Sequence, residues 1–332
     1  MEFRTEIFPK AAAEPLHHGS SIVSVGSCFA ERMGDRLRHY KFRLLQNPFG
    51  IIFHPLPLIA PLEIALSGKD AYSSELFQHE GKWRSLAFHS QLSHQDKRFL
   101  QDQIHAALQV TGMALRKADV LILTLGSAIG FEDVESGRIV ANCHKLPQQR
   151  FTSRLSRVGE LRLAFEGFLN QLFAANPKVQ VLLTVSPVRH LRSGLVENGG
   201  SKAVLRALCD ELCADFERVS YFPAFELLMD DLRDYRFCGR DLSHPNEMAE
   251  DYVWEKFAAS WLSDKARAVN AELDGVYRDL AHRPFEPNSE AHLGFLKKLH
   301  GRIDALRGLV DLDLELREVE ERMGDNTHPF DF

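Results

Sequence analysis

The sequence predicts an α/β fold: a three-layer sandwich with a mostly parallel five-stranded sheet, followed by a helical C-terminal extension. Short apolar runs alternate with longer segments whose apolar residues recur at helical spacing, which is typical of a parallel sheet flanked by helices. From Asp264 to Gly324 the chain is charged and favours helix, and such alternation is missing. We therefore expect an α/β domain over residues 1–262 and the helical extension over 263–332.

Five segments are predicted as strands. Val120–Leu125 (VLILTL) and Val179–Val185 (VQVLLTV) are nearly unbroken apolar runs, as expected for central strands covered on both faces. The other predicted strands are shorter: Ser21–Val25, Phe42–Gln46 and Val219–Phe225.

Helical periodicity begins at Phe29, directly after the first predicted strand, and returns between the later strands. The further predicted helices are Asp96–Ala118, Arg157–Asn176, Ser201–Phe216 and Asn246–Leu262.

Composition excludes several classes of partner. The chain of 332 residues has a formal net charge of −6, which gives no electrostatic case for nucleic acid or an anionic membrane. No apolar run reaches the roughly 18 residues of a transmembrane helix, and the N-terminus does not resemble a signal peptide. Five cysteines without scaffold-like spacing suit a reducing compartment, so we expect the cytoplasm.

The first candidate for chemistry is Cys28, in SIVSVGSCFAERMG, where the first strand turns into the first helix. In open α/β sheets ligands bind at that edge. The unpaired N–H groups and the dipole of a helix N-terminus favour the reactive thiolate. The alternative is a small apolar side chain that fills the core.

The second candidate is the Asp241–His244 pair in RDLSHPNEM, which follows the last strand. A carboxylate three residues before an imidazole can fix its tautomer and stabilise its cation. The alternative is a helix N-terminal cap beside a solvated histidine. Taken together, a nucleophile after the first strand and an Asp–His pair after the last satisfy the logic of a catalytic triad.

The segment VGSCFAERMG resembles the signature that names the GSCFA family, whose members resemble the SGNH (GDSL-type) hydrolases. The resemblance extends through NPFGIIFHP (47–55), TLGSAIGFE (124–132), ANCHKLP (141–147), SPVRH (186–190), NGGSKAVL (198–205), DLSHPNEMAEDYVWEKF (241–257) and RPFEPNSEAHLGFL in the tail. It implies a flavodoxin-like strand order and places Cys28 where SGNH enzymes have their nucleophilic serine. Ser27, at the position of the SGNH aspartate, is the alternative nucleophile. Asp241 and His244 match the last SGNH block, Asp-x-x-His.

The same resemblance locates the oxyanion hole and shows a departure from the pattern. Gly50 matches the glycine whose N–H holds the oxyanion. The third block corresponds to Gly126, Ser127 and Ala128, so alanine stands where SGNH enzymes have their asparagine donor. Since such a donor contributes about 3–4 kcal/mol to lowering the barrier, another group must replace it or the reaction is not ordinary ester hydrolysis. Asn47 and Asn142 are the nearest candidates.

Further polar residues are expected at the same edge of the sheet. Ser186, Arg189 and His190 follow the fourth strand, and Arg189 either binds a carboxylate or phosphate or pairs with Asp241. The remaining loop histidines at this edge are His89 and His144.

A helix-start feature is also present in NGGSKAVL. Ser201 and Lys202 would bind an anion at the start of a helix, or Ser201 would only cap that helix.

The sequence therefore predicts a hydrolase or acyltransferase that acts on an acyl ester of a small molecule or carbohydrate through Cys28, His244 and Asp241. No cofactor is expected, because the glycine-rich loops of nucleotide sites are missing, and no metal-binding motif occurs. Two alternatives stay open: a binding or scaffolding protein with impaired catalysis, and a metal-dependent hydrolase using His89, His144, His190 and His244. Assembly into a homo-oligomer through the C-terminal helices is also left open.

Overall fold

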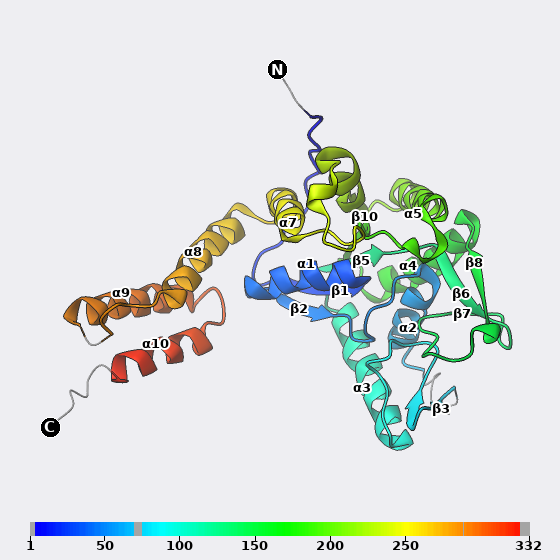
Figure 1. Ribbon diagram of the computed structural model, residues 1–332, viewed down its shortest axis with the longest axis horizontal. Helices are drawn as coiled ribbons and strands as arrows, with labels where there is room; N and C mark the ends of the chain where they lie inside the picture. Colours follow the sequence, from blue (N-terminus) through cyan, green and yellow to red (C-terminus); the bar gives the residue numbers. More distant parts are fainter. Residues whose placement is uncertain (1–3, 70–74, 288, 326–332) are drawn as a thin grey trace. The chain divides into compact units, whose positions relative to one another are not determined.

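The computed structural model describes residues 4–69, 75–287 and 289–325 (Figure 1). Its central element is a five-stranded sheet in the order β10-β9-β5-β1-β2. These strands are β1 (Ser21–Gly26), β2 (Arg43–Gln46), β5 (Val120–Leu125), β9 (Gln180–Val185) and β10 (Val219–Phe222). The pairs β1–β5, β5–β9 and β9–β10 are parallel. The predicted α/β fold with a mostly parallel five-stranded sheet is confirmed.

Helices cover both faces of this sheet (Figure 1). They are α1 (Cys28–His39), α2 (Pro55–Ser67), α3 (Lys97–Leu115), α4 (Val158–Ala175), α5 (Leu195–Asp215) and α7 (Glu247–Trp261). The strands β5 and β9 are buried almost throughout, with most of their side chains less than 5% exposed. This burial on both faces explains why their sequences are nearly unbroken apolar runs.

The structure contains elements that the sequence pattern did not predict. A hairpin is formed by β3 (Phe77–His79) and β4 (Lys82–Arg84), and an antiparallel sheet has the order β7-β6-β8. The strands of that sheet are β6 (Ile129–Asp133), β7 (Ile139–Val140) and β8 (Phe151–Leu155). Short helical turns are η1 (Gln148–Arg150), η2 (Leu191–Ser193), α6 (Ala224–Glu226), η3 (Leu227–Leu232) and η4 (Tyr235–Phe237). In the chain, the hairpin lies between α2 and α3, and the antiparallel sheet lies between β5 and α4.

The helix α2 was also missed, because its sequence carries three prolines, Pro55, Pro57 and Pro61. Two of them lie in the first turn, where a helix has no intrahelical use for their missing N–H groups. The His54 side chain caps this end by accepting from the Leu56 N–H at 3.2 Å. Only Pro61 removes an intrahelical hydrogen bond, so the helix tolerates the sequence.

The chain forms two compact units. The first comprises residues 1–10, 20–36 and 44–257, and the second comprises 11–19, 37–43 and 258–332. The second unit contains α8 (Asp264–Ala281), α9 (Glu290–Leu306) and α10 (Asp313–Asp325). The C-terminal helices therefore share their unit with two short N-terminal segments.

Specific contacts hold these N-terminal segments to the helices within the second unit. His18 stacks on Phe42 with ring centroids 4.3 Å apart and pairs with the Asn270 side chain at 3.2 Å. The Tyr40 hydroxyl donates to Asp274 at 2.9 Å. Within the described ranges, no helix is long and apolar enough to cross a membrane.

The packing of α2 against α3 gives a stability prediction. A Cβ added at Gly112 would lie 2.3 Å from the Ala65 carbonyl oxygen, so Gly112→Ala must push the two helices apart. We expect it to lower the free energy of unfolding by about 1–3 kcal/mol. Gly167→Ala, in the exposed face of α4 with nothing closer than 3.8 Å, is the matched control and should be neutral or slightly stabilising. Urea unfolding of both variants tests this, and equal effects would contradict the packing.

Candidate active site

Cys28 is the first residue of α1, directly after the turn that ends β1. Gly26 adopts φ +149°, and a Cβ there would lie 2.3 Å from the Thr124 carbonyl oxygen, so this position needs glycine. The Ser27 amide donates to that same carbonyl at 3.1 Å. The strand thus ends against β5, and the next residue begins the helix at the carboxyl edge of the sheet.

The Cys28 thiol is half-buried, and burial raises its pKa above the ordinary value. The N–H groups of Phe29 and of Cys28 itself lower the pKa, as expected at a helix N-terminus, but burial has the larger effect. The nearby Glu31 carboxylate raises the pKa further. The expected thiolate-favouring environment is therefore outweighed, and the resting group is a thiol that needs a base.

Asp241 and His244 form the pair that the sequence predicted. The Asp241 Oδ2 lies 2.5 Å from the His244 Nδ1, and Oδ1 accepts from the N–H groups of Ser243 at 3.0 Å and His244 at 3.1 Å. These three hydrogen bonds hold the pKa of Asp241 at about 2. Because Asp241 occupies Nδ1, Nε2 is the ring nitrogen left for other partners.

Cys28 and His244 line the same cavity, which has a volume of about 350 Å³. Val188 and Pro245 contribute apolar wall, and Glu31, Arg32, Asp35 and Glu250 contribute charge. In the part of the chain that the structure describes, no hydrogen bond joins Cys28 to His244. The fold brings a nucleophile and an Asp-supported imidazole to one cavity. Ser27 is only 1% exposed and does not line it.

Gly50 does not offer the oxyanion donor that the resemblance implied, since its N–H donates to the Asn47 carbonyl at 2.8 Å. Its φ of +75° and its contact with His89, where a Cβ would lie 2.4 Å away, explain the glycine. Asn47 instead has a buried Nδ2 without a partner. The Asn47 Oδ1 accepts from the Gly26 N–H at 2.9 Å, which fixes the amide beside the β1–α1 turn.

Ser127 is a structural residue rather than a group of the cavity. It is 3% exposed, and its hydroxyl lies 3.1 Å from the Ser201 Oγ and accepts from the Ile129 N–H at 3.0 Å. The Ala128 N–H donates to Ser201 Oγ at 2.7 Å. The segment after β5 is therefore held by its own hydrogen bonds and by those to Ser201.

Ser201 and Lys202 bind no anion at a helix start, which corrects that expectation. The helix α5 begins at Leu195, so both residues lie inside it, and they are 1% and 2% exposed. Ser201 contacts the loop after β5, and the Lys202 Nζ donates to the carbonyls of Gly126 and Ser186.

The residues after β9 have three different roles. Ser186 is fully buried, and its Oγ accepts from the Val188 N–H at 3.2 Å. Arg189 does not pair with Asp241: its guanidinium lies 5.1 Å over the Tyr235 ring and donates to the Met229 sulfur. The Arg189 N–H donates to the Ser243 carbonyl at 3.0 Å, which joins this loop to the one that carries His244.

His190 is the third of these residues and lies close to the site. Its Nε2 is buried without a partner, and a Cβ on Gly126 would lie 3.2 Å from that atom. Burial, followed by the charges of Lys202 and His244, lowers the pKa of His190 to about 4. The imidazole is therefore neutral at physiological pH.

The remaining predicted residues lie in loops after β4 and β7. His144 is 2% exposed and pairs with the Ser85 carbonyl at 2.7 Å, and the Asn142 Oδ1 accepts from the His144 N–H at 2.8 Å. The buried Nδ2 without a partner therefore distinguishes Asn47 from Asn142. His89 is half-buried. Burial lowers the pKa of its imidazole, and the Glu31 carboxylate opposes this shift.

The alternative of a metal-dependent hydrolase gains no support from the geometry. Over residues 4–69, 75–287 and 289–325, no group of three or more His, Cys, Asp or Glu side chains is arranged to hold a metal ion. His144 in particular is committed to a backbone carbonyl.

Comparison with known proteins identifies the family. The model of the GSCFA family matches residues 21–257, and that of the GSCFA domain protein, C-terminal domain, matches residues 273–325. The chain belongs to the GSCFA family. No curated protein matches the sequence.

Among solved structures, this GSCFA chain is similar to an acetyl xylan esterase (Est2A) from the rumen bacterium Butyrivibrio proteoclasticus. The identity is 12%, the TM-score is 0.35, and the match covers 79% of this chain. It spans 66% of the length of the esterase. A similarity this low carries no argument about activity.

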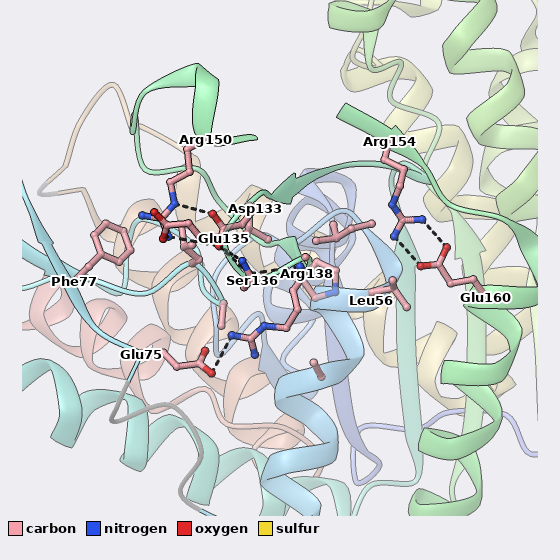
Figure 2. A pocket seen from close by; sticks show the side chains of 17 residues that line it. Leu56, Glu75, Phe77, Asp133, Glu135, Ser136, Arg138, Arg150, Arg154 and Glu160 are labelled. Carbon is pink, nitrogen blue, oxygen red and sulfur yellow. Dashed lines mark hydrogen bonds and ion pairs between the residues drawn. The ribbon is translucent and has the colours of Figure 1, made fainter. Parts of the chain in front are cut away.

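The GSCFA chain also has a larger cavity of about 520 Å³ that contains none of the predicted site residues (Figure 2). Its apolar lining residues include Leu56 and Phe77. Ion pairs flank it: Arg150–Asp133 at 2.7 Å and Arg138–Glu75 at 3.0 Å on one side, and Arg154–Glu160 at 2.7 Å on the other. Sequence reasoning missed it, because Asp133 and Arg154 come from the unpredicted strands β6 and β8, and Arg138 and Arg150 come from the segments between the strands of that sheet.

The raised pKa of Cys28 gives a prediction about its reactivity. A thiol whose pKa is raised above its ordinary value is mostly protonated at neutral pH, so alkylation of Cys28 by iodoacetamide should still accelerate at pH values where the rate for an ordinary thiol has levelled off. Peptide mass spectrometry from pH 6 to 10 measures the rate, with glutathione as the reference thiol. A rate that reaches its plateau by pH 7 would mean a preformed thiolate and would contradict this environment.

Proposed function

We propose that this GSCFA protein hydrolyses or transfers acyl groups from ester substrates through Cys28, His244 and Asp241. The observation that carries the proposal is the shared cavity of Cys28 and His244, with the His244 Nδ1 held 2.5 Å from Asp241. Nucleophile, base and orienting carboxylate come from the two ends of the α/β domain, as triad chemistry requires.

In the proposed reaction, the Cys28 sulfur attacks the ester carbonyl carbon while His244 Nε2 accepts the thiol proton. Asp241 stabilises the imidazolium that forms. Collapse of the tetrahedral intermediate breaks the bond to the alcohol, which leaves with the proton from His244. A thioester on Cys28 remains. Water or another acceptor then attacks it, His244 accepts the acceptor's proton, and collapse returns a proton to the Cys28 sulfur.

Asn47 is our proposed oxyanion donor in place of the missing asparagine. Three features support it: the buried Nδ2 without a partner, the Oδ1 fixed by the Gly26 N–H, and a φ of +41°, rare for a non-glycine residue. A strained, oriented and unsatisfied donor is what a preorganised site needs. The Cys28 N–H at the start of α1 is the second donor.

Protonation sets the working range of this triad. Since backbone and imidazole hydrogen bonds hold the pKa of Asp241 at about 2, its carboxylate stays charged at neutral and mildly acidic pH. Asp241 therefore does not set the acid limb of activity. The raised pKa of Cys28 makes the protonated thiol the starting state, so catalysis depends on His244 as base.

The proposal includes a substrate class and a compartment. The substrate class is an O-acyl ester of a small molecule or carbohydrate, and the cytoplasm is the proposed compartment. A homo-oligomer through α8, α9 and α10 stays a prediction.

A binding protein without efficient catalysis is the second candidate. It is favoured by the engaged N–H of Ala128, by the missing direct hydrogen bond between Cys28 and His244 in the described residues, and by the raised pKa of Cys28. The two candidates predict opposite results for ester turnover.

Turnover of an activated ester such as p-nitrophenyl acetate, measured with variants, tests the proposal. Cys28→Ala should abolish enzymatic turnover, and His244→Ala should lower kcat by about 10²–10⁴. Asn47→Ala should lower kcat by about 10²–10³, with little change in KM. Ser27→Ala is the control, with turnover close to wild type. Turnover that survives in Cys28→Ala and falls in Ser27→Ala would make Ser27 the nucleophile, and none in wild type would favour the binding protein.

A further inference from the structure

The cavity drawn in Figure 2 has no part in the proposed reaction. Its volume of about 520 Å³ is typical of small-molecule sites, which range over about 300–1,000 Å³. Cys28, Asp241 and His244 are not among the residues that line it. A ligand in this cavity would therefore be bound by a different set of side chains, and these indicate its chemistry.

One part of the lining is apolar and includes an aromatic ring. Phe77 of β3 contributes the ring, and Leu56 of α2 and Ile139 of β7 contribute aliphatic side chains. The ring of the half-buried Phe77 meets the buried His144 ring at a steep angle, with centroids 5.8 Å apart. The negative face of an aromatic ring attracts C–H groups, such as those on one side of a sugar ring.

The other part of the lining is charged, and its charges are paired. Among the described lining residues, four carry carboxylates and three carry guanidiniums. Each of these groups forms at least one ion pair with another of them, at 2.7–3.1 Å. A charged ligand would have to displace one member of a charge-assisted pair, whereas an uncharged ligand would not.

A buried carboxylate holds part of this charged lining in place. Asp133 is 1% exposed, and its Oδ1 accepts from the Arg150 Nε at 2.7 Å. Its Oδ2 accepts from the Ser136 hydroxyl at 2.7 Å and from the Ser136 N–H at 3.2 Å. Arg150 and the turn between β6 and β7 are thus fixed before a ligand enters, which lowers the entropic cost of binding.

The ion pairs leave hydrogen-bonding groups unused beside the apolar part. The Arg150 Nη1 and the Arg138 Nε and Nη1 form no hydrogen bond to another described residue. The second carboxylate oxygens of Glu75 and Glu135 are likewise without a partner among the described residues. Hydroxyl groups both donate and accept, so they match this mixture of N–H donors and carboxylate acceptors.

We propose that this cavity binds an uncharged saccharide, with a C–H face on Phe77 and hydroxyl groups on the unused N–H groups and oxygens of the ion pairs. A purely apolar ligand would remove these charged groups from water without replacing their hydrogen bonds. The inference goes beyond the proposed function, because it requires neither Cys28 nor ester turnover.

A panel of sugars that differ in charge tests the class of ligand. The neutral probes are the methyl glycosides of glucose, galactose, mannose, xylose and N-acetylglucosamine, and the charged ones are glucose 6-phosphate and glucosamine. Saturation-transfer difference NMR detects binding, and titration gives Kd. We expect at least one neutral glycoside to bind at millimolar concentration and more tightly than both charged sugars. No binding by any neutral glycoside, or preference for a charged sugar, would overturn the proposal.

Two variants with matched controls locate the site. Phe77→Ala removes the ring, and Arg138→Met removes the donors of an exposed arginine. Phe99→Ala and Arg236→Met are the controls, because both residues are exposed, Phe99 contacts the His94 ring, and Arg236 pairs with a carboxylate at 2.9 Å.

We expect Phe77→Ala to raise the Kd of the neutral glycoside by about tenfold. Arg138→Met should raise it by a smaller factor, and the two controls should match wild type. Melting temperatures show which variants are folded, and Arg138→Met keeps the test open if Phe77→Ala does not fold. A wild-type Kd in either folded cavity variant would overturn the proposal.

Turnover of p-nitrophenyl acetate, measured in parallel, keeps the two proposals distinguishable. This ester carries no sugar, so Phe77→Ala and Arg138→Met should hydrolyse it like wild type. Saccharide binding without ester turnover would refute the proposed function alone, and turnover without saccharide binding would refute the saccharide site alone.

Discussion

The close approach of β1 to β5 at Gly26 and Thr124 is the constraint on which the rest of this structure depends. No side chain fits between the two strands there, since a Cβ on Gly26 would lie 2.3 Å from a backbone oxygen. The contact ends β1 and starts α1 at Cys28. It also fixes the Gly26 N–H, which donates to the Asn47 Oδ1 at 2.9 Å. The chemistry at this edge is thus located by backbone geometry before any polar side chain contributes.

Around that junction, some buried polar atoms have hydrogen-bond partners in neighbouring loops and others have none. The side chains of Ser127, Ser186 and Ser201 are buried, and their hydroxyl oxygens accept hydrogen bonds from backbone N–H groups. The Ser27 Oγ, the Asn47 Nδ2 and the His190 Nε2 are buried without partners. Since buried polar atoms are almost always satisfied, such atoms beside a candidate nucleophile are the sign of a site that awaits a substrate.

The exposure of the Asp241–His244 pair also bears on the mechanism. Both side chains are about half exposed, so their mutual attraction adds little to stability. The hydrogen bonds from the Ser243 and His244 N–H groups nevertheless fix the carboxylate. The pair is therefore built for orientation of the imidazole rather than for stability.

The sequence predicted the main sheet because β5 and β9 are buried on both faces and so are apolar throughout. The last strand was predicted three residues too long, because the pattern ignored Pro223, which ends β10 at Phe222. The sequence pattern could not predict β6 and β8, which are partly exposed and carry charges, or β7, which is only two residues long.

At the site, spacing predicted that Cys28 and the Asp241–His244 pair meet at one edge of the sheet, because parallel strands deliver their carboxyl ends to one edge, and Cys28 and His244 do line one cavity. Spacing could not show that the Gly50 N–H is already engaged or that Lys202 is buried, since both depend on contacts between distant segments.

The most direct test of this account is the covalent intermediate. Wild-type protein mixed with an activated acetyl ester and quenched in acid would be examined by intact mass and peptide mapping. We predict one added acetyl group, located on Cys28 and removed by neutral hydroxylamine as a thioester is. An acetyl group on Ser27, or a protein that turns over ester without acylation of Cys28, would contradict it.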